Sequence, residues 1–193
     1  MQITSLPAHY LRFGVIGHAG GFDQWPPAEI PGLAKHVEGL GFSGIWMQEE
    51  HFLESTAGSS SPSILGSAIA AVTTRLRIGS SVFLLPLHNP LRLAEDIATL
   101  DALSNGRVEF GVWKGLNPKY FQAYRMKSDS RSDSFHESLK FIIRCWTQDS
   151  VDIDGASFKI LPKPMQKPHP PIYVGTYNPD TTKWIAEAGY KLI

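Results

Sequence analysis

The sequence predicts an α/β protein of the (β/α)8 TIM-barrel type, incomplete in this chain. Short apolar runs recur along the chain, segments with helical spacing separate them, and no G-x-G-x-x-G turn follows the first run. Nearly continuous apolar strands that alternate with helices are typical of a parallel sheet covered by helices. Without the glycine-rich turn, a barrel is favoured over a doubly wound dinucleotide-binding sheet. In both folds the functional residues lie at the carboxyl ends of the strands.

Five apolar runs are predicted as strands, and a sixth begins at the last residues. They cover residues 12–18, 44–52, 76–85, 107–113 and 172–176, with the sixth starting at 191–193. Because a complete (β/α)8 barrel takes about 250 residues, the chain holds about five βα units plus the start of strand six. Open parallel edges leave backbone groups unpaired. We therefore expect either a truncated barrel or a variant that closes through another chain.

Helical spacing and capping residues predict the segments between the strands. The predicted helices cover residues 30–40, 63–73, 91–103 and 135–146, and a last helix begins at Pro179. Proline fits the first turn of a helix, and Gly41 is a suitable residue to end the first one. Residues 150–171 break the alternation with a predicted hairpin that turns at Asp154 and Gly155, followed by a proline-rich return. We interpret this segment as an insertion within one βα unit of a single domain over residues 1–193.

Composition narrows the classes of partner. Lys and Arg together number 18, as do Asp and Glu, so no charge surplus favours nucleic acid. The single cysteine, Cys145, excludes an intrachain disulfide framework and fits a reducing compartment as a buried thiol. No signal peptide and no apolar stretch of about 20 residues is present, so no membrane association is expected. The sequence indicates a cytoplasmic protein that binds a small molecule or another protein.

The second run ends in two carboxylates and an imidazole, Glu49-Glu50-His51. Such groups transfer protons or bind metals. Side chains alternate along a strand, so Glu49 and His51 share one face and Glu50 lies on the other. This spacing does not favour a three-ligand metal site, and no metal is predicted. Pairing of these groups with neighbouring Arg or Lys at the barrel rim is the alternative.

Two other strand ends suggest an anion site. The fourth run ends at Lys114, whose ammonium can meet a phosphate as a point charge. The fifth run ends in Gly175, Thr176, Tyr177 and Asn178. The helix that follows carries Thr181 in its first turn, where free backbone N–H groups and hydroxyls favour anions. Ordinary helix capping by Asn178 and a solvated Lys114 is the alternative.

Three stretches of the chain form a recognisable pattern: GIWMQEEHF, RLRIGSSVFLLPLHNPLRLAEDIATLDALSNGRVEFGVWKGL and TYNPDTTKWIAEAG. With these stretches the chain resembles the bacterial luciferase-like family of flavin-dependent monooxygenases. The order of strand, His-x-Pro, acidic helix, Leu-Asp-x-Leu-Ser-x-Gly-Arg and a strand ending in a cation and glycine is the most specific part. The resemblance covers nearly the whole chain, from RFGVIGH to the terminal KLI.

The resemblance implies a (β/α)8 barrel that binds FMN, reduced by a separate flavin reductase, and uses oxygen to oxidise a small organic substrate such as an aldehyde. Lys114 takes the place of the family's phosphate-binding arginine, and Tyr177, Asn178 and Thr181 that of its phosphate-cradling turn. The resemblance also predicts a cis peptide between Ser81 and Val82, under the flavin ring.

The departures from the family pattern leave alternatives open. Glu50 takes the place of the catalytic histidine of the luciferase α subunit, and only His51 of the histidine pair is kept. Trp113 stands at the reactive cysteine position. These changes resemble the non-catalytic subunit, so a flavin-binding partner protein is one alternative. A related barrel enzyme that uses the deazaflavin F420 for hydride transfer is another. Exposed parallel edges predict a homodimer or heterodimer.

Overall fold

The computed structural model describes residues 14–16, 25–52 and 60–193. Its strands are β1 (Gly14–Ile16), β2 (Gly44–Met47), β3 (Arg77–Ser80), β4 (Phe83–Leu84), β5 (Val108–Trp113), β6 (Val151–Ile153), β7 (Ala156–Phe158), β8 (Ile172–Val174) and β9 (Lys191–Leu192). Its helices are α1 (Ile30–Gly39), α2 (Pro62–Val72), the 3-10 turn η3 (Leu85–Leu87), α3 (Pro90–Leu103), α4 (Pro118–Ala123), α5 (Arg131–Thr147) and α6 (Pro179–Glu187).

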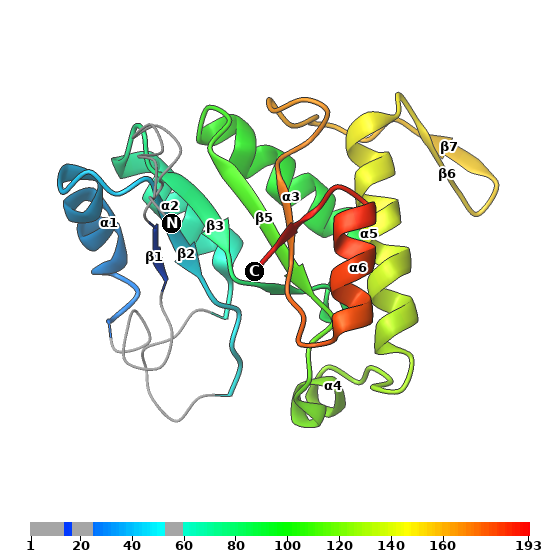
Figure 1. Ribbon diagram of the computed structural model, residues 1–193. Coiled ribbons are helices and arrows are strands. Elements are labelled where there is room, and N and C mark those ends of the chain that lie inside the picture. The colour runs from blue at the N-terminus through cyan, green and yellow to red at the C-terminus, as the bar shows by residue number, and fades with distance from the viewer. Residues whose placement is uncertain (1–13, 17–24, 53–59) are drawn as a thin grey trace, which may run out of the picture.

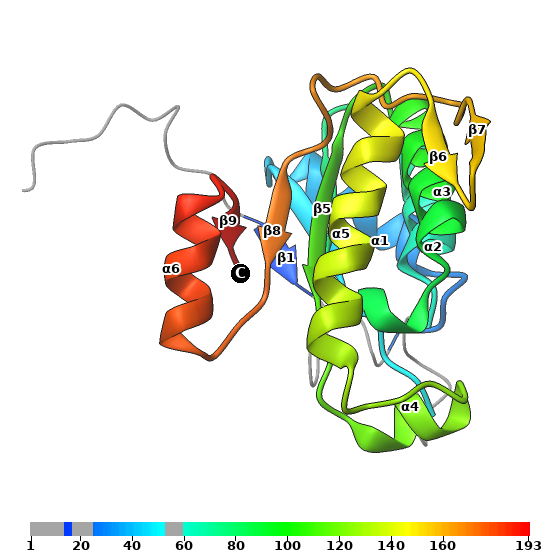
Figure 2. The same cartoon turned by 90° about the vertical axis from the view of Figure 1, so that its right-hand side faces the viewer.

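The main sheet is parallel and curled, with the strand order β1-β2-β3-β5-β8-β9 and with β4 also paired to β5. The helices lie along its outer side, and α4 lies beyond the carboxyl ends of the strands (Figures 1 and 2). The prediction of an incomplete (β/α) barrel is therefore confirmed. Residues 12, 13, 17 and 18 of the first predicted strand lie outside the described residues.

The structure differs from the sequence prediction at several places, and the run 172–176, for example, is a strand only as far as Val174. The run 76–85 forms two strands, β3 and β4, which are separated by Ser81 and Val82. The run 44–52 is a strand only as far as Met47. The polar stretch 117–133 after β5, for which no helix was predicted, contains α4, and Asn117 caps this helix by accepting a hydrogen bond from the Lys119 amide.

A second difference in the same stretch concerns α5, which begins at Arg131 rather than at residue 135. The polar first turn of α5 carries Ser132 and Asp133, and helical spacing of apolar residues gives no signal there. The early start matters for the site, because it adds one turn of α5 next to the end of β5.

The core lies between the sheet and the helices on its outer side. α3 and α5 bury Ile97 and Ile142 completely, and the Trp146 indole donates a hydrogen bond to the Ala94 carbonyl at 2.9 Å. Cys145 is buried in the same layer, as predicted, and burial raises the pKa of its thiol.

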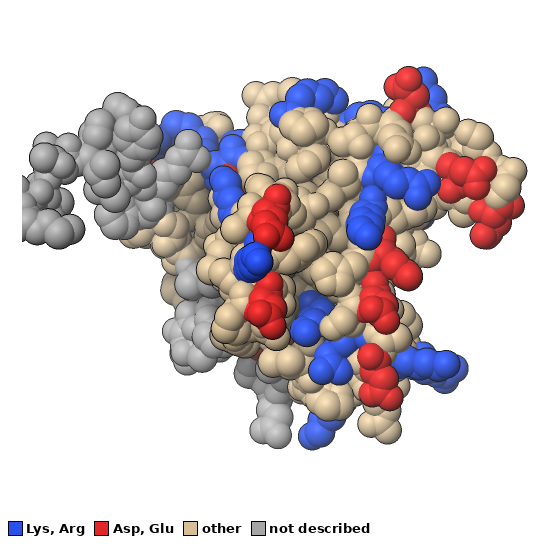
Figure 3. Space-filling model, turned by 45° about the vertical axis from the view of Figure 1, so that its right-hand side comes forward, with Lys and Arg blue, Asp and Glu red and all other residues tan. Residues whose placement is uncertain are grey.

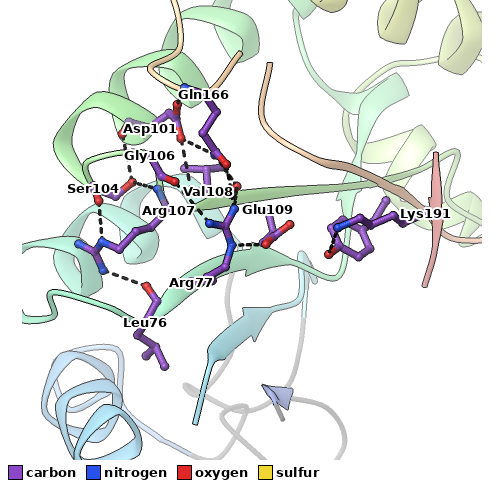
Figure 4. Close-up of polar contacts among 11 residues, drawn as sticks. Leu76, Arg77, Asp101, Ser104, Gly106, Arg107, Val108, Glu109, Gln166 and Lys191 are labelled. Atoms are coloured by element: carbon purple, nitrogen blue, oxygen red, sulfur yellow. Dashed lines mark hydrogen bonds and ion pairs between the residues drawn. The ribbon is translucent and has the colours of Figure 1, made fainter. Parts of the chain in front are cut away.

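The Leu-Asp-x-Leu-Ser-x-Gly-Arg motif builds the turn between α3 and β5 (Figure 4). Arg107 is buried and donates hydrogen bonds to backbone carbonyls of Ala70, Thr73 and Leu76. Asp101 accepts from the backbone and side-chain nitrogens of Gln166. These contacts join the amino ends of β3 and β5 to the return segment before β8. The most specific part of the sequence pattern therefore has a structural role, at the end of the sheet opposite to the strand carboxyl ends.

Residues 150–171 contain the predicted hairpin, which consists of β6 and β7 and projects away from the main sheet (Figure 1). It turns at Asp154 and Gly155, which both have positive φ, and Asp152 accepts from the Gly155 amide. The interpretation of this segment as an insertion within one domain stays a prediction.

Charge is mixed over the surface. On the face seen in Figure 3, basic and acidic side chains are interspersed, in keeping with the formal net charge of +0. None of the helices within the described ranges combines the length and the apolar composition that crossing a membrane requires.

Candidate functional site

A cavity of about 330 Å³ lies at the carboxyl ends of β2, β3, β5 and β8. Its lining residues are Gln48, Ser81, Val82, Trp113, Gly175, Thr176, Tyr177 and Ile193. The structure thus brings together most of the residues predicted to bind the cofactor. The Ser81–Val82 peptide is cis, as the resemblance predicts.

Aromatic rings form part of the cavity wall. The rings of Trp113 and Tyr177 meet edge to face at 5.7 Å between centroids. A Cβ atom at Gly175 would lie 3.4 Å from the Trp113 ring and 3.6 Å from the Val82 side chain. Glycine at this position therefore keeps open the space between two walls of the cavity.

A smaller cavity, of about 70 Å³, adjoins the first one, and we call it the cationic cavity. It is lined by Trp113, Lys114, Ser132, Phe135, His136, Val174, Gly175, Thr176 and Thr181. Lys114 Nζ donates a hydrogen bond to Ser132 Oγ at 3.3 Å. The predicted convergence of Lys114 and the first turn of the last helix is therefore present in the structure. Trp113, Gly175 and Thr176 line both cavities, so the two cavities share part of their walls.

Sequence reasoning missed the two polar residues that α5 contributes to the cationic cavity, Ser132 and His136. The His136 ring packs edge-on against Trp184 of α6, at 4.7 Å between centroids. Burial lowers the pKa of His136, the charges of Lys140 and Lys114 lower it further, and Asp133 opposes them. Adjacent in sequence to Ser132, the Arg131 Nε atom is buried without a hydrogen-bond partner among the described residues.

Asn178 caps α6. Its side-chain oxygen accepts a hydrogen bond from the Asp180 backbone amide at 2.8 Å, and the backbone amide of Asn178 donates to Thr176 Oγ1 at 3.0 Å. The capping alternative is therefore present for this residue. A direct contact of Asn178 with a cofactor stays a prediction.

A separate polar cluster surrounds Glu49, which is buried at 4% exposure. Its carboxylate accepts from the Leu84 amide at 2.8 Å and lies 2.9 Å from the Nε2 atoms of both His51 and His88. Burial raises the pKa of Glu49, but the hydrogen bonds from His51 and His88, the His88 charge and the Leu84 amide together lower it below its ordinary value. Glu49 is therefore an anion that holds two imidazoles and the start of η3.

The His51 ring connects this cluster to α4. Nε2 of His51 faces the Glu49 carboxylate and donates to it, and Nδ1 lies within hydrogen-bond distance of the Tyr124 hydroxyl, at 3.0 Å. Burial and the Glu49 charge raise the pKa of Tyr124. Glu49 and His51 contact each other, in agreement with the prediction that they share one face. The partners of the Glu49 carboxylate are imidazoles, and not the Arg or Lys of the alternative.

Neither of the predicted catalytic residues, Glu50 and His51, is among the residues that line the larger cavity. His51 is buried in the Glu49 cluster, and Glu50 is half-buried. Gln48, the residue directly after β2, lines the cavity. The catalytic role of both residues stays a prediction. Within the described ranges, no group of three or more His, Cys, Asp or Glu side chains is arranged to hold a metal ion.

The fold and the two cavities define a class: a barrel-type α/β protein with a cationic cavity next to a larger, partly aromatic cavity at the strand carboxyl ends. The family model described as luciferase-like monooxygenase matches residues 9–193. The chain belongs to this family.

Among curated relatives, the chain is 28% identical over 167 residues to the alkanal monooxygenase alpha chain of Photorhabdus luminescens. The match covers 83% of this chain and 46% of that protein. The chain spans about half the length of the curated relatives it matches.

Solved structures show the same fold. Monooxygenase RslO1 from Streptomyces bottropensis superposes with a TM-score of 0.84 at 29% identity, covering 94% of this chain and 59% of that one. The oxygenating constituent of 3,6-diketocamphane monooxygenase from Pseudomonas putida, in complex with FMN, gives 0.79 at 18% identity, over 94% and 56% of the chains. An F420-dependent secondary alcohol dehydrogenase in complex with an F420-acetone adduct gives 0.73 at 21% identity, over 90% and 54%.

Proposed function

We propose that this chain forms the FMN-binding part of a flavin-dependent monooxygenase that uses reduced FMN and oxygen on a small organic substrate such as an aldehyde. The observation that carries the proposal is the shared wall of the two cavities. A phosphorylated flavin needs room for a large, mostly apolar ring next to a compact site for its phosphate, and the two cavities offer these spaces side by side.

The residues of the cationic cavity fit a phosphate. Lys114 supplies a positive charge, and Ser132, Thr176 and Thr181 supply hydroxyl donors. The larger cavity fits an aromatic ring system, because Val82, Trp113 and Tyr177 present apolar and aromatic surface there. These residues would hold the phosphate and the ring respectively.

Reduced FMN, when bound, supplies the electrons with which such enzymes activate oxygen. The chain's own contribution is to bind and orient the flavin, to exclude water, and to hold protons at defined atoms. Glu50 is the candidate to exchange a proton with the bound reactants. His51 holds its Nε2 proton against Glu49 and serves as a positioning residue for this strand end.

An aldehyde substrate is supported by the similarity to an alkanal monooxygenase alpha chain. We further propose that a separate flavin reductase supplies reduced FMN, that the protein acts in the cytoplasm, and that it forms a homodimer or heterodimer. Sedimentation of the purified chain as a stable monomer would contradict the dimer.

Two alternatives keep specific support. The fold match to an F420-dependent dehydrogenase favours hydride transfer with F420, and tighter binding of F420 than of FMN would establish it. Glu50 and Trp113, at the positions of a catalytic histidine and a reactive cysteine, favour a non-catalytic flavin-binding partner. Oxidation of a long-chain alkanal by the isolated protein with reduced FMN would exclude that alternative.

The binding test is a titration of the chain with FMN, followed by quenching of flavin fluorescence. Replacing Lys114 with alanine removes a charge-assisted contact worth about 1.5–3 kcal/mol, which corresponds to an affinity about 12- to 150-fold weaker. Lys119→Ala, in the exposed first turn of α4, is the matched control and should leave the affinity unchanged. The proposal fails if the unaltered chain binds neither oxidised nor reduced FMN, or if Lys114→Ala binds FMN as tightly as the unaltered chain.

A further inference from the structure

The cationic cavity contains a titratable group that the phosphate contacts proposed so far do not use. His136 lines this cavity together with Lys114, although the two residues come from different elements, α5 and the end of β5. The hydroxyls of Ser132, Thr176 and Thr181 line the same space. No acidic side chain is among the lining residues, so the cavity presents one permanent cation, one imidazole and several hydroxyls.

Aromatic side chains hold the His136 ring in place, and the charged residues around it determine whether the ring is protonated. Phe135 and Trp184 pack edge-on against the ring, at 5.2 Å and 4.7 Å between centroids. The charged groups that act on it are Asp133 and Lys140 on its own helix and Lys114 from the end of β5, whereas α6 contacts it with the uncharged Trp184 ring. The two cations and burial favour the neutral imidazole in the free protein, and Asp133 only partly opposes them.

We propose that His136 is the second cationic group of this cavity, and that it binds the phosphate monoester of the ligand in its protonated form, beside Lys114. This inference rests on the proposed function for the identity of the ligand, a flavin phosphate. A phosphate dianion next to the ring favours the imidazolium, because an opposite charge nearby stabilises the charged form. Binding therefore takes up a proton, and the neutral ring of the free protein becomes a charged donor in the complex.

The affinity for the ligand should therefore depend on pH only when the ligand carries a phosphate. The ligand-bound pKa of His136 lies above the free one, so FMN affinity should increase as the pH falls from about 8 to about 6, by roughly 5- to 10-fold. Riboflavin, which has the ring but no phosphate, should show no such increase. Below about pH 6 the phosphate itself takes up a proton, which limits the useful range.

The experiment measures FMN affinity against pH for the unaltered chain and for two variants. His136→Gln keeps a polar side chain without a titratable charge, and it should weaken FMN binding at the acidic end and flatten the profile. His136→Arg carries a permanent charge, so it should bind FMN tightly and without pH dependence. Far-ultraviolet circular dichroism verifies that both variants fold. A profile for His136→Gln that matches the unaltered chain overturns the proposal.

Calorimetry and NMR provide readouts that do not depend on turnover. Titration with FMN in buffers of different ionisation enthalpy should show proton uptake near neutral pH in the unaltered chain and none in His136→Gln. With inorganic phosphate as the probe, the ring protons of His136 should report a raised pKa. A raised pKa with phosphate but no flavin binding keeps the anion role and rejects the flavin function. FMN binding without proton uptake keeps the flavin function and rejects the role of His136.

Discussion

Glu49 offers the most direct test of how the site is held together. Replacing it with glutamine keeps the size of the side chain but removes the charge that faces His51, His88 and the Leu84 amide. The glutamine oxygen can accept one of these hydrogen bonds, and its NH2 group then faces a donor. Two charge-assisted hydrogen bonds, each worth about 1.5–3 kcal/mol, are lost, and relief from burying a charge offsets part of that loss. We expect Glu49→Gln to lower the free energy of unfolding by about 2–4 kcal/mol.

Urea unfolding followed by tryptophan fluorescence measures this difference. Glu50→Gln is the matched control, because the neighbouring carboxylate is half-buried and lies outside the Glu49 cluster. The control should change the free energy of unfolding by less than about 0.5 kcal/mol. Equal effects of the two substitutions, or a loss below about 1 kcal/mol for Glu49→Gln, would refute the reasoning, because the carboxylate would then not hold the cluster.

The same comparison has a defined pH dependence. The pKa of Glu49 in the folded chain is lowered, whereas the unfolded chain titrates near its ordinary value of about 4.3. The stabilisation by the carboxylate is therefore fully present above about pH 4.3 and is lost as the pH falls through the lower folded value. The difference between the unaltered chain and Glu49→Gln should therefore shrink below about pH 4.

Three further predictions concern stability and reactivity. Gly111→Ala should destabilise the protein by about 3 kcal/mol or more, because the new Cβ would lie 1.8 Å from the Ser80 carbonyl oxygen. Gly32→Ala on α1 should instead stabilise the protein by about 0.5–1 kcal/mol, because the new Cβ would have no neighbouring atom within 4 Å. Urea unfolding measures both changes. Arg107→Leu should cost about 3–5 kcal/mol in the same assay, since it leaves several buried carbonyls without a donor, and a loss below about 1 kcal/mol would contradict the role of its turn. Cys145 should react with Ellman's reagent only when the chain unfolds, because the thiol is buried and its pKa is raised. Rapid reaction in the native protein would contradict this prediction and would show that the packing between α3 and α5 opens.

The cavity residues could be predicted because the end of a strand can be recognised from a short stretch of sequence, and the parallel sheet then brings these ends together. Val82, Trp113 and Gly175 are far apart along the chain, but each lies near or at the end of a predicted apolar run, and the family resemblance also singled out Val82 and Trp113. In a parallel sheet the carboxyl ends of all strands meet at one edge, so identifying the runs is enough to place these residues together. The observed cavity contains all three.

Ser132 and His136 could not be found in this way. They lie on a helix, where the face that meets a site depends on how the helix rotates and where it begins. The apolar spacing of α5 starts at Phe135, whereas the helix starts at Arg131, so the predicted helix did not include Ser132. The packing of His136 depends on Trp184 of α6, a contact between two helices that no local pattern in the sequence specifies.

The end of β2 shows how one sequence motif divides between two roles. Two carboxylates and an imidazole in a row suggest a single catalytic group, but Glu49 and His51 contact each other on the side of His88, whereas Gln48 lines the cavity. A carboxylate that already accepts three hydrogen bonds, with a lowered pKa, is a poor proton acceptor at neutral pH. Glu49 therefore stabilises the position of this strand end, and the proton chemistry we propose falls to Glu50, whose carboxylate is outside that cluster.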